Sequence, residues 1–240
     1  MSKGVIYYTD NNLREPIFST VQQTILASHL PIVSVSLAPL DFGKNIVLDL
    51  TPSYITMLLQ IVKALEMSDA TYVFFCEHDV LYPPSHFEFT PPTDTIFYYN
   101  ANVWRWGYPT NMAIAYDRLI SLSGLSVNRQ FALTHYQKRL KRIKDLGLTT
   151  DHKKHEPGWA RKWGYEPGTK KIKRGGFSDD DFETWRSAEP LVDIRHGRTF
   201  SQSKVTLQSF IHKPTGWRET TLDQIPGVGW DLATLFNLSP

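Results

Sequence analysis

The first eighty residues alternate between short apolar runs and segments whose apolar positions recur with helical spacing. The runs at residues 5–8, 31–37 and 71–76 are rich in β-branched and aromatic side chains, which is typical of strands. Residues 16–29 and 52–66 repeat apolar positions every three or four residues, which predicts helices. This order of strands and helices is typical of right-handed crossovers. We therefore predict an α/β fold with a mainly parallel central sheet flanked by helices.

The second half of the chain carries weaker patterns. Further strands are expected at residues 95–99, 112–116 and 191–194. A helix with a basic face is expected at residues 131–146, closed by the glycine that follows, and another helix is expected to begin within residues 117–122. We interpret the tail after residue 200 as a segment that packs onto the sheet through its tryptophans.

Composition places the chain among globular proteins. Its 240 residues are 41% hydrophobic and 13% aromatic, which is ample for a substantial core. The single cysteine, Cys76, lies inside an apolar run, so an intramolecular disulfide is excluded and core packing is favoured over a nucleophilic role. No apolar stretch has the length of a membrane span, and the start of the chain lacks the order of a signal peptide. From this we expect a cytoplasmic protein.

Positive charge is concentrated in one segment. The whole chain carries a net charge of +2, but residues 136–174 hold 13 Lys and Arg against 4 Asp and Glu, so this basic segment carries +9 and the remainder −7. Segregation of this size favours an anionic partner such as a phosphate-rich acceptor, nucleic acid or a membrane surface. A solvated helix followed by a basic loop explains the same pattern equally well.

Two carboxylates follow the most apolar of the predicted strands. Glu77 and Asp79 lie at its end, and the carboxyl edge of a parallel sheet is where open α/β folds place ligands. Two hard oxygen donors at this spacing can share a divalent cation, and a cation can neutralise a diphosphate. Alternation along the strand would point His78 to the opposite face, so we interpret it as structural. Acidic residues also begin turns after core strands, which is the competing explanation.

Three segments resemble motifs of the nucleotide-sugar-dependent glycosyltransferases of the GT-A fold. They are residues 8–11, residues 77–79 and residues 193–197. The resemblance implies that the loop after the first strand holds the nucleobase and ribose, and that the acidic motif binds Mn²⁺ or Mg²⁺. It assigns Asp79 as a metal ligand, His196 as a further ligand, and Glu77 as a ribose or second metal contact. The motif reads ExD where the family has DxD, which leaves the role of Glu77 open.

An acidic stretch near residue 180 supplies candidates for a catalytic base. Ser178, three aspartates and the aromatic residues after them predict an N-capped helix over residues 178–185. The stretch is similar in placement to the acidic helix start that provides the general base in inverting, family-2-like transferases. On that resemblance the candidates are Asp181, Asp180 and Asp179, with Asp181 preferred. Favourable charges at a helix dipole explain the same pattern, and a retaining reaction needs no such base.

Other polar residues near the predicted strand ends suit a nucleotide. Carboxylates and amides fit the hydroxyls of ribose and the edge of uracil, and cations fit phosphate. The candidate nucleotide-binding residues are Thr9, Asp10, Asn11, Arg14, Lys44, Glu77, Arg195 and Arg198. Trp104, Trp106 and Tyr108 either stack on an acceptor or pack in the core. Aromatic clusters of this kind are more often found packed in the core.

The leading hypothesis is a single-domain, metal-dependent glycosyltransferase that uses a nucleotide sugar, with a UDP sugar as the expected donor. Residues 1–120 would form the nucleotide-sugar half and residues 121–240 the acceptor half. A hydroxymethylated base in DNA is an acceptor that fits the basic segment. The alternatives are a transferase directed at glycans or lipids, a nucleotidyltransferase, and a non-catalytic nucleic-acid-binding protein on a transferase scaffold. The sequence leaves the sugar, the stereochemistry and the oligomeric state open.

Overall fold

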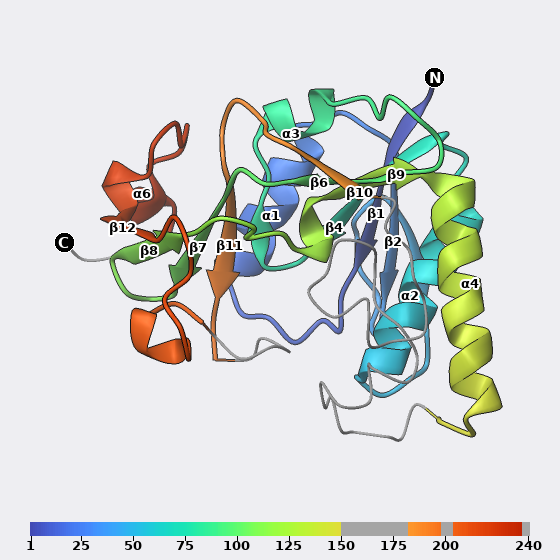
Figure 1. Ribbon diagram of the computed structural model, residues 1–240. Helices are drawn as coiled ribbons and strands as arrows, with labels where there is room; N and C mark the ends of the chain where they lie inside the picture. Colours follow the sequence, from blue (N-terminus) through green and yellow to red (C-terminus); the bar gives the residue numbers. More distant parts are fainter. Residues whose placement is uncertain (150–181, 198–203, 237–240) are drawn as a thin grey trace.

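The computed structural model describes residues 1–149, 182–197 and 204–236 (Figure 1). Its strands are β1 (Lys3–Tyr8), β2 (Ile32–Ser36), β3 (Lys44–Val47), β4 (Tyr72–Glu77), β5 (Val80–Leu81), β6 (Phe97–Asn100), β7 (Val103–Gly107), β8 (Met112–Ala115), β9 (Leu125–Asn128), β10 (Phe182–Trp185), β11 (Leu191–Arg195) and β12 (Arg218–Thr221). Its α-helices are α1 (Ile17–Leu26), α2 (Tyr54–Met67), α3 (Pro84–Glu88), α4 (Arg129–Asp145) and α6 (Leu232–Leu235).

A seven-stranded sheet forms the centre of the molecule, in the order β10-β6-β9-β4-β1-β2-β3. The pairs among β1, β2, β3 and β4 are parallel, as is the pair of β10 with β6, whereas β9 runs antiparallel to both of its neighbours. The side chains of β1 and β4 are buried on both faces, which explains why these strands read as continuous apolar runs. The predicted α/β fold with a mainly parallel central sheet is confirmed.

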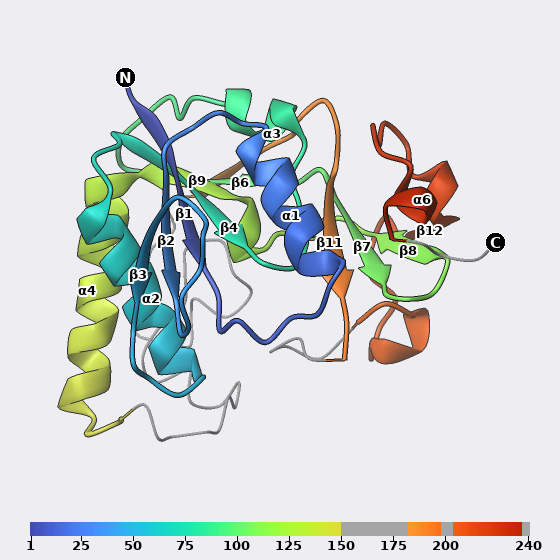
Figure 2. The same cartoon turned by 180° about the vertical axis from the view of Figure 1, so that it is seen from behind.

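Helices cover both faces of this sheet. Alternate residues of β1 point to opposite sides, so that Val5 and Tyr7 pack with α1 while Ile6 and Tyr8 pack with α2 and α4. Figure 2 shows α1 in front of the sheet, and α2 and α4 lie together at one side. The predicted basic helix is confirmed as α4, which ends before Gly147, a residue with a φ of +67°.

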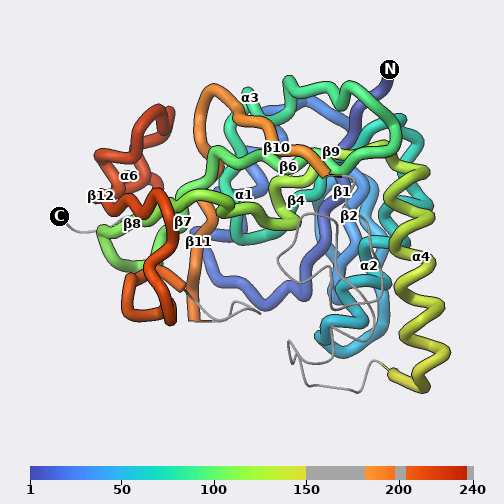
Figure 3. The backbone as a smooth tube through the Cα atoms, viewed as in Figure 1, coloured from blue at the N-terminus to red at the C-terminus, as the bar shows by residue number. Residues whose placement is uncertain are grey.

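A second sheet, which the sequence analysis did not anticipate, extends the fold. Its order is β12-β8-β7-β11-β5, and its pairs are antiparallel except for β11 with β7. The path of the chain in Figure 3 shows this sheet beside the first, with the tail wrapped against it. Trp217 stacks on Tyr116 and Trp230 packs against the same core, as expected for the tail. Trp104 and Trp106 are buried, which confirms core packing for these two residues.

Two predicted helices are wrong. Residues 182–185 form strand β10, which pairs in parallel with β6, because Phe, Thr and Trp fit a sheet edge better than a helix. The chain after β8 does not start a helix either, since Arg118 adopts a φ of +59° and only a short 3₁₀ turn follows at Leu122–Gly124. Within the described ranges, no helix combines the length and apolar character needed to cross a membrane.

Candidate functional site

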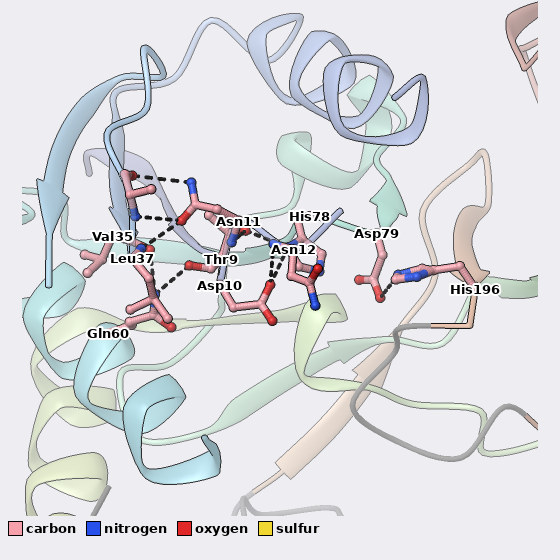
Figure 4. Close-up of polar contacts among 11 residues, drawn as sticks. Thr9, Asp10, Asn11, Asn12, Val35, Leu37, Gln60, His78, Asp79 and His196 are labelled. Atoms are coloured by element: carbon pink, nitrogen blue, oxygen red, sulfur yellow. Dashed lines mark hydrogen bonds and ion pairs between the residues drawn. The ribbon is translucent and has the colours of Figure 1, made fainter. Parts of the chain in front are cut away.

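Three side chains meet where the two sheets adjoin. Asp79 Oδ2 lies 3.7 Å from His196 Nε2, and these two residues lie with His78 such that one potential ligand atom of each falls within 4.8 Å of the others. Figure 4 shows the carboxylate of Asp79 and the ring of His196 pointing toward one another from separate segments. Asp79 and His196 are both buried. We call Asp79, His78 and His196 the acidic-imidazole cluster.

Backbone pairing brings the cluster together. Strand β4 ends at Glu77, the chain turns, and β5 begins at Val80 and pairs antiparallel with β11. The N–H of Ile194 donates to the carbonyl of Asp79 at 2.8 Å, and β11 ends one residue before His196. The two ligand candidates that the sequence placed far apart are therefore held together by sheet hydrogen bonds, and do not depend on a mobile side-chain contact.

His78 does not lie where strand alternation would place it. It follows the last residue of β4 and belongs to the turn, so the two-residue period of the strand no longer applies to it. Its Nδ1 lies 2.6 Å from Thr9 Oγ1, which also accepts from the N–H of Asn11 at 2.9 Å. A hydrogen bond at Nδ1 orients the ring and leaves Nε2 as the metal-binding nitrogen. The expectation that His78 points to the opposite face is wrong, because its ring lies in the same cluster as Asp79.

The two carboxylates of the turn have different surroundings. Burial alone would raise the pKa of Asp79, but the hydrogen bond from His196 and the electrostatic interactions with His78 and Arg195 outweigh it and lower the pKa. Burial raises the pKa of Glu77 to about 8, and the charge of Asp79 contributes in the same direction. Glu77 accepts a hydrogen bond from Tyr8 at 2.7 Å and is not one of the three clustered residues. At neutral pH, Asp79 is thus the ionised one of these two carboxylates.

The cluster fits a divalent metal ion by its donor set. One carboxylate oxygen and two imidazole nitrogens are ligands that Mn²⁺ and related ions accept. The hydrogen bond between His78 Nδ1 and Thr9 Oγ1 is the kind of outer contact that fixes a ligating imidazole. Asp79, His78 and His196 are therefore the residues that would hold the ion.

A pocket of about 100 Å³ adjoins the cluster at the carboxyl ends of β1 and β4. Gln60, from α2, donates to the carbonyls of Thr9 at 2.7 Å and Val35 at 3.1 Å and so fixes the ends of β1 and β2 relative to each other. The residues that line the pocket are Tyr8, Thr9, Asp10, Leu37, Pro52, Ser53, Thr56, Met57, Gln60, Glu77, His78 and Asp79. Both cluster residues of the turn open onto this pocket.

A larger groove of about 650 Å³ reaches the cluster at His196. Its lining residues are Leu13, Arg14, Glu15, Ile17, Tyr108, Pro109, His196 and Gly197. The ring of Tyr108 is held edge-on against Trp106, with ring centres 5.2 Å apart. Because His196 lines the groove while His78 and Asp79 line the pocket, the cluster stands between the two hollows.

The structure brings only some of the predicted nucleotide residues to the pocket. Thr9, Asp10 and Glu77 line it. Asn11 instead accepts from the backbone N–H groups of Leu37 and Ala38, at 2.8 and 3.0 Å, and so ties two loops together (Figure 4).

The remaining predicted residues lie elsewhere. Lys44 is exposed at the start of β3, the edge strand of the first sheet, and does not line the pocket. Arg14 faces the groove, and Arg195 is paired with Asp193 on β11. Arg198 and the candidate bases Asp179, Asp180 and Asp181 lie outside the described residues.

Sequence reasoning missed several residues of the site. Tyr8 and Gln60 line the pocket, and Arg105 and Asp193 form a buried ion pair between the adjacent strands β7 and β11. A polar glutamine within the apolar face of the predicted second helix was one available signal, because such a residue needs buried partners. A second signal was that an aspartate and an arginine occupy alternate positions in, and just beyond, the strand at residues 191–194.

Comparison with known proteins gives similarities in structure only. No protein-family model matches the chain, and no curated protein matches it. A glycosyltransferase involved in glycosylation of the major capsid of PBCV-1 is similar with a TM-score of 0.43 and 7% identity, over 80% of this chain and 93% of that one. The glycosyltransferase GlyE of Streptococcus pneumoniae TIGR4 is similar with a TM-score of 0.39 and 13% identity, over 78% of this chain and 46% of that one.

A third similar structure is a mutant of Drosophila β1,4-galactosyltransferase 7 in complex with manganese, UDP-Gal and xylobiose. Its TM-score is 0.33 at 14% identity, over 62% of this chain and 63% of that one. The chain therefore spans less than two thirds of this protein and about half of GlyE. All three are glycosyltransferases.

Proposed function

We propose that the protein is a metal-dependent glycosyltransferase that moves a sugar from a nucleotide sugar to a hydroxyl acceptor. The observation that carries the proposal is the acidic-imidazole cluster at the carboxyl ends of β1 and β4, between a pocket and a groove. Ligands of open α/β folds bind at this edge of the sheet. A metal-binding set placed there, next to a hollow lined by Asp10 and Thr9, suits a nucleoside diphosphate.

Each residue of the cluster has a distinct role in this proposal. Asp79, His78 and His196 hold the metal ion, which when bound stabilises the negative charge of a leaving diphosphate. Thr9 fixes the ring of His78, because its hydroxyl lies 2.6 Å from Nδ1. Glu77, with its raised pKa, stays protonated near neutral pH and keeps Asp79 as the single ionised carboxylate of the turn.

The two hollows suit the two substrates. The pocket beside Asp10 receives the nucleoside of the donor, for which a UDP sugar is the proposed identity. The groove lined by His196 receives the acceptor, because a hydroxyl that enters there reaches the cluster at a residue that does not line the pocket. Tyr108 offers the groove an aromatic ring, which suits a sugar or a base. For an inverting reaction Asp181 remains the proposed base, followed by Asp180 and Asp179.

The proposed identity of the acceptor rests on the positive charge of the basic segment. In the described part of the basic segment, α4 presents the exposed residues Lys138, Lys141 and Lys144. A polyanion such as DNA with hydroxymethylated bases fits this charge, and its binding is expected to weaken steeply with added salt, because neutralised phosphates release counterions. An acceptor on a glycan or lipid-linked intermediate would give transfer with much weaker salt dependence.

A thermal-shift panel tests the proposed function. The protein is heated with UDP, GDP, CMP or dTDP, each with Mn²⁺ or with EDTA, since a ligand that binds only the folded state raises the melting temperature. We expect one nucleotide to stabilise the protein in Mn²⁺ and to lose most of that effect in EDTA. The sugar nucleotides of that base are then assayed for metal-dependent hydrolysis and transfer. No stabilisation by any nucleotide, with salt-sensitive DNA binding instead, would support the nucleic-acid-binding alternative.

A further inference from the structure

The groove is lined by an aromatic ring that the fold holds in place. Tyr108 is half-buried and lines the groove. Its ring packs edge-on with the buried rings of Trp106 and Phe236, at 5.2 and 6.2 Å between ring centres. Its backbone N–H donates to the carbonyl of Arg195 at 3.0 Å, which ties it to the end of β11. The exposed part of this ring is therefore a rigid surface in the groove that His196 also lines.

Two side chains of opposite charge line the same groove. Arg14 and Glu15 precede α1, and both are exposed. Oε2 of Glu15 accepts from the N–H and from the hydroxyl of Ser19, at 3.1 and 2.5 Å, so that the carboxylate is held in place while Oε1 keeps its capacity to accept. The guanidinium of Arg14 offers N–H donors in one plane. Hydrogen-bond donors and acceptors thus lie side by side in the groove.

This combination of groups suits a sugar ring. One face of a pyranose presents C–H groups, which are attracted to the electron-rich face of an aromatic ring. The edge of the pyranose carries neighbouring hydroxyls, which donate to a carboxylate and accept from a guanidinium. The volume of the groove, about 650 Å³, lies within the range of about 300–1,000 Å³ that is usual for sites of small ligands.

Charge and position both disfavour a polyanion in the groove. Arg14 and Glu15 carry opposite charges, so that apart from His196 the described lining has no excess of positive charge. The groove-lining residues Ile17 and Tyr108 belong to the core on the α1 face of the first sheet, whereas α4 packs with the core on the opposite face. Figures 1 and 2 both show the central strands between β11 and α4. The groove and the lysines of α4 are therefore separate surfaces of the molecule.

We infer that the groove binds a neutral saccharide as the acceptor, with its ring on Tyr108 and its hydroxyls on Arg14 and Glu15. The inference rests on the proposed function, because it takes the groove as the acceptor side of a transferase. It narrows the acceptors considered above to a glycan, and it places the basic residues of α4 outside the acceptor site.

Binding of methyl glycosides tests the inference. The protein is saturated with Mn²⁺ and UDP, or with the nucleotide that the thermal-shift panel selects. It is then titrated with the methyl glycosides of glucose, galactose, mannose and xylose, and saturation-transfer NMR reports which of them binds. A DNA duplex that contains 5-hydroxymethylcytosine is titrated in parallel. We expect at least one glycoside to bind with the same affinity at low and at high salt, because a neutral ligand releases no counterions.

Tyr108→Ala is compared with Tyr108→Phe. Alanine removes the ring and is expected to weaken binding of the glycoside by about tenfold, whereas phenylalanine keeps the ring and is expected to stay within about threefold of the unaltered protein. The melting temperature in UDP and Mn²⁺ shows whether each variant keeps its fold and its pocket. Equal affinities for the glycoside in the two variants would overturn the inference.

Arg14→Gln keeps the test decisive if Tyr108→Ala does not fold. Arg14 is exposed, so its substitution is expected to leave the fold intact and to weaken binding of the glycoside by roughly threefold or more, because hydrogen bonds to its hydroxyls are lost. Lys213→Gln removes an exposed positive charge outside both hollows and is the matched control. In that case, equal affinities in Arg14→Gln and Lys213→Gln would overturn the inference.

Two further outcomes separate the inference from the proposed function. A protein that binds UDP in Mn²⁺ but none of the glycosides would contradict a saccharide site, and salt-sensitive binding of the DNA that is lost in Tyr108→Ala would assign the groove to a base instead. If the unaltered protein binds no nucleotide in Mn²⁺, it is the proposed function itself that fails, and the inference falls with it.

Discussion

The carboxylate of Asp79 lies 3.7 Å from the imidazole of His196, and a backbone hydrogen bond from Ile194 to Asp79 fixes this approach. One residue belongs to the turn after the first sheet's central strand β4, and the other follows a strand of the second sheet. The pairing of β5 with β11 is therefore the structural basis of the candidate metal centre. Any substitution that loosens this pairing is expected to weaken metal binding without touching a ligand.

Thr9→Val is expected to weaken metal binding by about tenfold, because outer-shell hydrogen bonds to ligating imidazoles are typically worth that much. Valine keeps the size of threonine but removes the hydroxyl that lies 2.6 Å from Nδ1 of His78. Titration with Mn²⁺ under calorimetry measures the effect. Thr9→Ser is the matched control, since it retains the hydroxyl. Equal affinities in the two variants would show that His78 is not oriented by Thr9.

Glu77→Gln is expected to stabilise the protein at alkaline pH. The folded-state pKa of Glu77 is raised to about 8 from an ordinary value of 4.5, so its contribution to stability is complete below pH 4.5 and is lost as the pH rises through 8. Glutamine has no charge to bury and keeps an oxygen for the hydrogen bond from Tyr8. Relative to the unaltered protein, the variant should gain about 2 kcal/mol in unfolding free energy between pH 6 and 8.

Urea denaturation in EDTA at the two pH values measures this gain. Nucleotide binding at pH 7 in Mn²⁺ is expected to survive in the same variant, since the protonated acid and the amide are similar in shape. Loss of metal binding in Glu77→Gln, with no gain in stability, would instead make Glu77 an ionised metal ligand.

His86 gives the fold a sensitivity to acid that is separate from the cluster. Its side chain is fully buried, its Nδ1 lies 3.2 Å from Asn100 Nδ2, and its ring stacks on Trp185. Burial lowers the pKa of His86 to about 3 from an ordinary 6.5, so its contribution to stability is complete above pH 6.5 and is lost as the pH falls toward 3.

His86→Phe is expected to remove this dependence. The loss of unfolding free energy that is assigned to His86 amounts to as much as about 3 kcal/mol between pH 7 and 4. Unfolding by urea at these two pH values should therefore show a smaller drop in the variant than in the unaltered protein, even if the variant is less stable at pH 7. Parallel drops in the two proteins would contradict a neutral, buried His86.

Local patterns of the sequence predict the central sheet because its strands are buried on both faces and its helices have one apolar stripe. The same reasoning places Asp79 at a sheet edge, since the apolar run of β4 stops there. It fails for His78, because strand alternation was extended beyond the end of the strand at Glu77 into a turn. It fails again at residues 182–185, where pairing with β6 overrides a sequence that resembles a capped helix start.

The second sheet depends on contacts between distant segments. Strands β5 and β12 have two and four residues, too few for a periodic pattern, and their partners, β11 and β8, are distant in sequence. Arg105 and Asp193 could not be paired from sequence for the same reason, because only the register of β7 with β11 places them opposite one another. His196 is a candidate metal ligand only through the resemblance to a family, because no local sequence pattern distinguishes it from other histidines.

Binding of Mn²⁺ by the unaltered protein, by Asp79→Asn and by His196→Ala tests the central claim most directly. Calorimetric titration of each protein, after its fold has been checked by circular dichroism, is expected to show one site in the unaltered protein and at least tenfold weaker binding in both variants, with nucleotide-induced stabilisation lost in parallel. Affinity for Mn²⁺ that is the same in all three folded proteins would contradict a metal centre at Asp79 and His196.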